Sequence, residues 1–240
     1  MQSNIYVTLS AQLALQRRME TIANNVANAT TAGFRAEEMT FAEITSHQDR
    51  QPVSYVSRGG VRLSLTPGEI AHTGNPFDLA IRGNSFFAVQ TPNGTAYTRD
   101  GRLQMLPGGE ITELNGNPVL DVSGSPLQVD PNGGPPAISK DGTIIQSGRQ
   151  IGAIGLFHIN ADAKLTRAEG ALIVPDAEPQ AELDFNANGI VQGFSEKSNV
   201  NPVLEMTHLI AVQRTFEAIT NLIRESETSL QDAIKSLAGS

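Results

Sequence analysis

The last 40 residues carry a heptad repeat that strongly limits how this chain can fold. Val203 to Ala238 contains neither Gly nor Pro, so no residue in it interrupts a helix. The repeat consists of Leu209, Phe216, Ile223, Leu230 and Leu237, with Val212, Ile219, Ser226 and Ala233 at the companion positions. At 1.5 Å per residue such a helix is about 55 Å long, too long to fold back onto one small domain. The narrow apolar seam favours another helix as its partner.

A second helical pattern covers the first 30 residues. Its apolar positions, at alternating steps of four and three, are Leu15, Met19, Ile22, Val26 and Ala29. Asn24, Asn25 and Asn28 lie within this pattern, although Asn is a poor helix former because its amide competes for backbone hydrogen bonds. Their presence calls for an explanation beyond helix propensity.

The middle of the chain has the pattern of a β-domain. Short β-branched and aromatic runs between Phe77 and Phe194 are separated by the Asn-Gly and Asp-Gly pairs that hairpin turns favour. Residues 35–76 show no sustained period, which indicates an extended connector or an irregular hairpin. We therefore predict an α+β fold: a central antiparallel sandwich or irregular barrel, with long N- and C-terminal helices that pair as a coiled coil. The predicted divisions are 1–34 (helix), 35–76 (connector), 77–195 (β-domain) and 196–240 (coiled-coil helix).

Composition argues against several classes of protein. The net charge of −8 and the lack of a large basic cluster argue against nucleic-acid binding. With no Cys, the chain has no disulfide, thiol nucleophile or Cys-based zinc site. No apolar stretch approaches the ~20 residues of a membrane helix, so we expect no direct membrane insertion. Arg17-Arg18 is followed by the polar "METIANN" rather than an apolar run, so we expect no cleavable signal peptide.

Candidate metal and catalytic residues have simpler interpretations. Asp184, Asn186 and Asn188 match the first half of a calcium-binding loop, but Ser195 occupies the position of the bidentate Glu, which favours a β-turn. The histidines are isolated in the sequence: His47, His72, His158 and His208. Asp100 and Asp141 precede Gly, which favours turns over acid–base chemistry. We expect no catalytic site, no metal site and no cofactor.

Three stretches resemble signatures of the flagellar basal-body rod and hook protein family. They are "IANNVANATTAGFRA" (22–36), "TGNPFDLAIRGNSFFAVQTPNGTAYTRDG" (73–101) and "NGIVQGFSEKSNVNPVLEMTHLIAVQRTFEA" (188–218). Together they cover about a third of the chain, and the chain length and opening are most similar to the proximal rod type. Ser85 is a departure, because the family usually has Gly before the paired Phe residues.

The resemblance implies a mechanical function: a structural rod subunit that transmits torque across the periplasm and polymerises through its terminal helices. The implied partners are other proximal and distal rod proteins, further copies of this chain and the flagellar type III export apparatus. The expected assembly residues are Leu15, Met19, Ile22, Asn24, Asn25, Val26, Asn28, Leu209, Val212, Gln213, Phe216, Ile219, Ile223, Leu230 and Leu237.

The asparagines fit this picture, because an amide in a helix seam penalises wrong registers. We expect them to pair with polar groups of neighbouring subunits, with Gln213 and Thr220 as candidates; a frayed, Asn-rich helix end is the alternative. Two other functions remain open at this point: a distal rod protein of the same family, and a secreted β-domain binding module on a coiled-coil oligomer.

Overall fold

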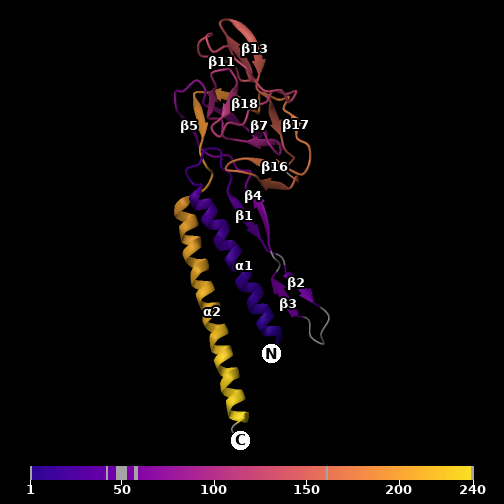
Figure 1. The fold of residues 1–240 in the computed structure, drawn as a ribbon, viewed down its shortest axis with the longest axis vertical. Helices are drawn as coiled ribbons and strands as arrows, with labels where there is room; N and C mark the ends of the chain where they lie inside the picture. Colours follow the sequence, from indigo (N-terminus) through magenta and orange to yellow (C-terminus); the bar gives the residue numbers. More distant parts are fainter. Residues whose placement is uncertain (1, 42, 47–52, 57–58, 161, 239–240) are drawn as a thin grey trace. The chain divides into compact units, whose positions relative to one another are not determined.

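A computed structural model describes residues 2–41, 43–46, 53–56, 59–160 and 162–238 (Figure 1). The chain divides into two compact units. Unit 1 comprises Met1–Ala27, Glu37–Arg62 and Asn201–Ser240, and unit 2 comprises Asn28–Ala36 and Leu63–Val200. The chain therefore passes between the units at residues 27/28, 36/37, 62/63 and 200/201.

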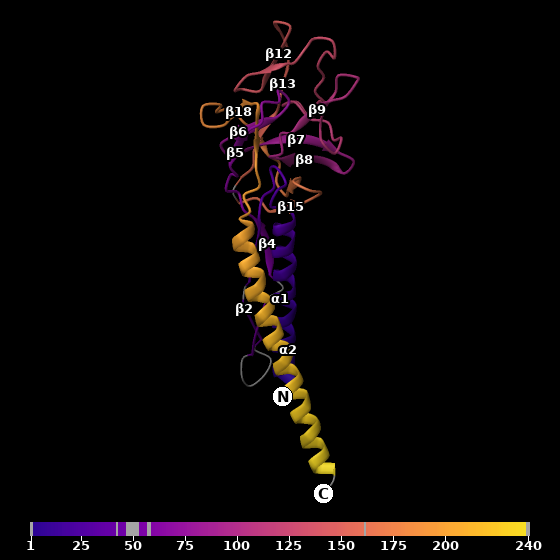
Figure 2. The same cartoon turned by 90° about the vertical axis from the view of Figure 1, so that its left-hand side faces the viewer.

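Unit 1 is built around two helices, α1 (Gln2–Ala27) and α2 (Pro202–Ala238), which lie side by side in Figures 1 and 2. Asn201 caps α2, because its side-chain oxygen accepts a hydrogen bond from the Leu204 N–H at 3.1 Å. Pro202 then occupies the first helical position, where its missing N–H is not needed. Across the pair, the Gln12 amide donates to the Thr220 hydroxyl at 3.5 Å.

Four strands complete unit 1. β1 (Glu37–Thr40) pairs with β4 (Gly60–Leu63), and β2 (Glu43–Ser46) pairs antiparallel with β3 (Val53–Val56). Part of the predicted connector, residues 42, 47–52 and 57–58, lies outside the described residues. Both β1 and β3 contact α1, so strands as well as α2 cover this helix.

The prediction of an α+β fold with two long helices paired as a coiled coil is wrong. The described chain is mostly β-structure, with one long C-terminal helix and a shorter N-terminal helix that ends at Ala27. The N-terminal seam spans only about two heptads, fewer than a coiled coil needs. In addition, Leu9 and Leu13 of α1 stay about half exposed, and strands contact α1 beside α2. The heptad spacing therefore indicates an apolar stripe on each helix, and it does not establish that α1 and α2 form a supercoiled pair.

Unit 2 consists of short antiparallel strands in several sheets. The largest has the order β15-β16-β8-β7-β14-β17. Its strands are β7 (Ser85–Thr91), β8 (Gly94–Thr98), β14 (Leu156–His158), β15 (Leu165–Arg167), β16 (Ile173–Pro175) and β17 (Gln180–Ala181). Pro92 and Asn93 form the turn between β7 and β8, with Thr91 paired to Gly94, so the Asn93-Gly94 pair lies where the turn meets β8. The sequence therefore identified this hairpin by its turn residues.

Smaller sheets surround this one. β6 (Leu79–Arg82) pairs with β18 (Gly189–Gln192), and β5 (Ile70–His72) pairs with β19 (Phe194–Glu196), as Figure 2 shows for β6 and β18. β9 (Leu103–Met105) pairs with β10 (Ile111–Glu113), and β12 (Thr143–Gln146) lies between β11 (Ala137–Ile138) and β13 (Arg149–Ala153). Two of these pairings join strands more than 100 residues apart in the sequence, so the last strands close the fold.

The core of unit 2 lies on both faces of β7. Successive side chains of a strand point to opposite faces, so Phe87 and Val89 enter one apolar cluster while Phe86 and Ala88 enter another. Because both faces are buried, β7 is a continuous apolar run instead of an alternating one.

Replacing Phe87 with Ala tests this arrangement. Phe87 is fully buried, so we expect its truncation to lower the free energy of unfolding by about 3–5 kcal/mol in urea denaturation. Leu183→Ala is the control, because Leu183 is 87% exposed and its loss should leave the urea midpoint unchanged. Equal effects of the two substitutions would contradict the assignment of the core.

Candidate functional site

The predicted assembly residues lie on the two helices of unit 1 and in the turn after α1. Ile22 of α1 and Val212 of α2 are buried. Half-buried positions are Leu15, Met19, Asn24, Val26, Asn28, Leu209, Phe216, Ile219 and Ile223. Gln213 is exposed and donates to Glu217 on its own helix at 3.2 Å. Leu230 and Leu237 belong to α2, but their side chains are not among those described.

Asn25 forms its hydrogen bonds within its own chain. Its amide oxygen accepts from the Glu37 N–H at 2.8 Å, and its amide nitrogen donates to the Glu37 carbonyl at 2.9 Å. The side chain thus binds the start of β1 as a neighbouring strand would. The same nitrogen also donates to the Glu205 carboxylate of α2 at 3.2 Å, and only 2% of Asn25 is exposed. Pairing of Asn24 and Asn28 with neighbouring subunits stays a prediction.

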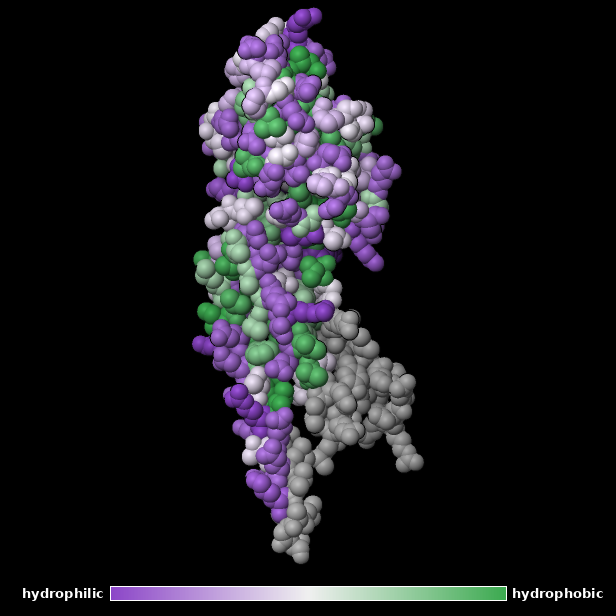
Figure 3. Space-filling model, viewed as in Figure 1, coloured by the Kyte–Doolittle hydropathy of each residue, from purple (hydrophilic) through white to green (hydrophobic). Residues whose placement is uncertain are grey.

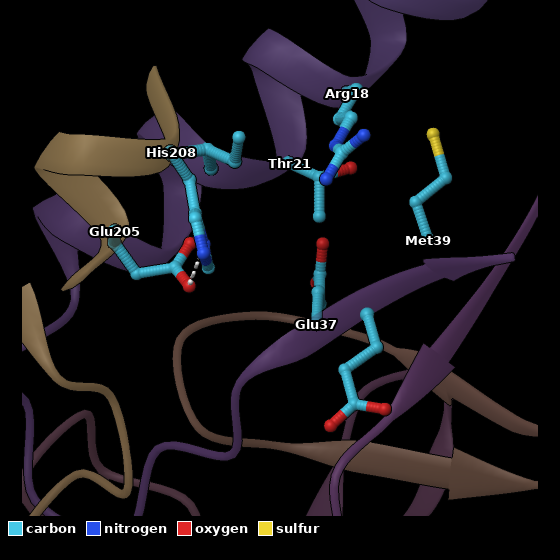
Figure 4. Close-up of a pocket in the computed structure, with 8 residues that line it drawn as sticks. Arg18, Thr21, Glu37, Met39, Glu205 and His208 are labelled. Carbon is cyan, nitrogen blue, oxygen red and sulfur yellow. Dashed lines mark ion pairs between the residues drawn. The ribbon is translucent and has the colours of Figure 1, made fainter. Parts of the chain in front are cut away.

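A charged groove lies beside Asn25 in unit 1 (Figure 4). One part encloses about 280 Å³ and is lined by Arg18, Thr21, Ile22, Glu37, Glu38, Met39, Glu205 and His208. The adjoining part encloses about 460 Å³ and shares Thr21, Glu37 and Met39 with it. His208 Nδ1 lies 3.6 Å from the Glu205 carboxylate, so the pair becomes ionic when the imidazole is protonated. The groove offers mixed charges, and among the described residues no cluster of His, Asp and Glu is able to hold a metal ion.

Both helices of unit 1 also expose apolar side chains. On α2, Val203, Leu204, Met206, Ile210 and Leu222 are each at least half exposed, and Leu9 and Leu13 on α1 are about half exposed. Figure 3 shows apolar side chains among polar ones along the upper part of α2. Large apolar side chains gathered on one element are typical of a surface that another protein covers.

A second notable site lies in unit 2, where three segments adjoin the covalent connections to unit 1. We call residues 28–36, 63–69 and 196–200 the link segments. Their backbones are hydrogen-bonded to one another: Gly33 N–H donates to the Glu196 carbonyl at 2.9 Å, and Ser64 N–H donates to the Ala36 carbonyl at 2.8 Å. Asn199 joins all three, because its side chain accepts from the Ala36 N–H and donates to the Thr66 carbonyl.

Glu196 lies between two buried arginines of unit 2. One of its carboxylate oxygens is 2.9 Å from the Arg35 guanidinium, and the other is 2.6 Å from that of Arg99. Each of the three side chains is at most 3% exposed. The carboxylate also accepts from the Gly68 N–H at 2.9 Å, and Arg99 donates to the carbonyls of Ile81 and Ser85. One carboxylate therefore connects all the link segments to strands β6 and β7.

Burial shifts the ionisation of both arginines in the same direction. The pKa of Arg35 is lowered to about 10, because burial lowers it more than the Glu196 carboxylate raises it, and the charge of Arg99 also lowers it. Burial also lowers the pKa of Arg99, which Glu196 in turn raises. Both guanidiniums remain charged at neutral pH, so the site holds two positive charges and one negative charge out of water.

The sequence did not identify Arg35, Arg99 and Glu196 as a group. Each is a charged residue within or beside a family-like stretch, but no spacing rule joins positions so far apart. Ser85, the departure from the family pattern, begins β7 fully buried and donates to the Glu182 carboxylate at 2.6 Å. Positive φ falls instead on Gly83, at 98°.

Three of the remaining sequence candidates, Asp184, Asp141 and His72, form turn hydrogen bonds or a ring contact. Asp184 accepts from the Asn186 and Ala187 N–H groups, which confirms the turn. Asp141 caps the Thr143 N–H in the same way, and these hydrogen bonds lower the pKa of its carboxyl group. His72 contacts the Phe194 ring, and His47 lies outside the described residues. No described helix combines the length and apolar character needed to cross a bilayer.

Three family descriptions match successive parts of the chain. Residues 5–35 match "Flagella basal body rod protein", residues 80–146 match "Flagellar hook protein FlgE/F/G D1 domain", and residues 191–236 match "Flagellar basal body rod FlgEFG protein C-terminal". The first and third matches fall largely on α1 and α2, and the second falls on the β-strands of unit 2.

Full-length relatives agree with these matches. A flagellar basal-body rod protein FlgF of Mesorhizobium japonicum is 48% identical over 99% of this chain and 98% of that protein. FlgF of Rhizobium meliloti is 42% identical over the whole of both chains. A rod protein FlgG of Bacillus subtilis is 26% identical over 96% of this chain and 97% of that protein.

Asn25→Leu tests the role of the buried amide. The substitution removes the hydrogen bonds that Asn25 forms with the backbone N–H and C=O of Glu37, so we expect the free energy of unfolding to fall by about 1–3 kcal/mol. Gln16→Leu on the exposed surface of α1 is the control and should change stability little. If chemical denaturation shows the Asn25 variant to be as stable as the control, these hydrogen bonds do not stabilise unit 1.

Proposed function

Because the chain belongs to the FlgF family of flagellar basal-body rod proteins, which are structural subunits and not enzymes, we propose that it carries torque by assembling through α1 and α2. The exposed apolar side chains of the two helices carry this proposal. An isolated chain leaves Leu13, Met206, Ile210 and Leu222 at least half exposed, and neighbouring subunits would cover them. Head-to-tail contacts of this kind, when they do not close into a ring, produce a helical assembly.

The expected assembly residues then have two roles. Those on the inner sides of α1 and α2, such as Ile22 and Val212, hold the helices of one subunit together. Gln213, which is exposed, faces neighbouring rod proteins of the proximal and distal types. The groove beside Asn25 adds charged side chains of both signs to the same unit, which favours a defined orientation of the neighbour.

The proposal extends to the location and route of the protein. In the basal body the subunit belongs to the part of the rod that crosses the periplasm, and the flagellar type III export apparatus delivers it there. The family match supports both statements. The distal rod position is less favoured, because the relatives at 48% and 42% identity are both FlgF, the proximal type, whereas two FlgG relatives are 30% and 26% identical. A secreted binding module is disfavoured by the same full-length matches.

Met206→Glu combined with Ile210→Glu tests assembly through α2. Both side chains are already about half exposed, so the purified variant should keep the unfolding midpoint of the unchanged chain. Charges on a face that a neighbour covers would block assembly, because a buried unpaired charge is strongly unfavourable. We expect cells that carry only this variant to lack rods and swimming motility. Thr215→Glu, on another face of α2, is the control for added charge.

The readout is swimming in soft agar together with electron microscopy of isolated basal bodies. Complete rods and normal swimming in the doubly substituted strain would contradict assembly through this surface of α2.

A further inference from the structure

We propose that Glu196 is a positioning residue that makes the link segments of unit 2 one rigid joint, through which load arriving along the chain reaches the β-sheets. The load-carrying part of this inference rests on the proposed function. The joint itself rests only on contacts within unit 2.

Each link segment is held by Glu196 or by a residue that binds it. Residues 28–36 are bound through the Arg35 guanidinium and through the Gly33 N–H, which donates to the Glu196 carbonyl. Residues 63–69 are bound through the Gly68 N–H, and Arg35 also donates to the Thr66 carbonyl. The third segment, 196–200, begins with Glu196.

Arg99 connects the same carboxylate to the sheets. It follows β8, and its guanidinium donates to Glu196 and to the carbonyls of Ile81 in β6 and Ser85 in β7. Force applied to any link segment therefore reaches β6 and β7 through charged hydrogen bonds, which are stronger than neutral ones. Arg167 adds an outer contact, because its guanidinium lies 4.0 Å from the centre of the Phe34 ring.

The charge balance makes Glu196 the least replaceable of the three residues. Arg35 and Arg99 repel each other, and Glu196 is the carboxylate that faces both of them. When one partner of a buried ion pair is removed, the remaining charge is left without compensation. Loss of the Glu196 charge should therefore release the link segments, while the apolar clusters around β7 stay intact.

Hydrogen–deuterium exchange of the full-length chain tests the joint. In Glu196→Gln we expect backbone amides of residues 33–36, 64–69 and 197–200 to exchange about 10- to 100-fold faster, as the loss of charged hydrogen bonds implies. Amides of β7 and β8 should keep their rates. The matched control is Glu113→Gln, since Glu113 is also a buried carboxylate of unit 2 but accepts from Asn115 and Asn117 instead.

Arg35→Lys keeps the test decisive if the Gln variant does not fold. Lysine retains the positive charge but loses the planar fork that reaches both Glu196 and Thr66. We expect faster exchange confined to residues 28–36 and 63–69. Unchanged amide exchange in the link segments, or an increase in exchange spread evenly over unit 2, would contradict the proposal of a joint.

A motility assay then tests the load-carrying part. Strains that carry only the Arg35→Lys subunit should build rods but lose at least about half of their swimming speed in viscous medium, whereas Glu113→Gln strains should swim normally. Normal swimming under load, despite faster exchange of the link segments, would overturn the assignment of this joint to torque. Failure of the proposed rod assembly is a separate result, because it is read from the Met206 and Ile210 variant.

Discussion

The order of the link segments depends on the buried group of Arg35, Glu196 and Arg99. Two guanidiniums and one carboxylate are removed from water, which is favourable only when the geometry satisfies nearly every donor and acceptor. Backbone groups of Gly68, Ile81 and Ser85 supply additional hydrogen bonds, although within the described part of the chain the buried Arg35 Nε has no hydrogen-bond partner. Since Glu196 is the last residue of β19, the group forms only after the N-terminal link segment and the end of the β-fold have met.

In unit 1, the side-chain amide of Asn25 forms the hydrogen bonds that a neighbouring strand would form. Asn25 binds both backbone groups of Glu37 and so fixes the start of β1 to α1. Its third hydrogen bond, to Glu205, involves α2 as well. This explains an Asn in an apolar helix stripe without any partner from another subunit. Apolar side chains elsewhere on both helices remain exposed, as a subunit that assembles through them requires.

The sequence predicted features that depend on neighbouring residues. The heptad segment without Gly or Pro indicated α2, which Asn201 caps. Asn-Gly and Asp-Gly pairs marked turns such as the one between β7 and β8. By contrast, the coiled coil was wrong, because heptad spacing shows where an apolar stripe lies but does not show that strands also cover the helix.

The contacts that could not be predicted join residues that are far apart in the sequence. Arg99 and Glu196 are 97 residues apart, and neither has a neighbour in sequence that signals the pairing. Asn199 binds the Ala36 N–H and the Thr66 carbonyl, which belong to two segments far from it in the sequence. The pairing of buried charged residues therefore cannot be predicted from the sequence, because it depends on the topology that brings them together.

A double-mutant cycle on Arg35 and Arg99 measures most directly whether Glu196 couples a link segment to the sheet. Either Arg→Met variant leaves the carboxylate with one guanidinium, whereas the double variant leaves it buried and unpaired. By urea denaturation, we expect the double variant to lose about 1–3 kcal/mol more than the sum of the single losses. Losses that add to within about 0.5 kcal/mol would contradict the coupling.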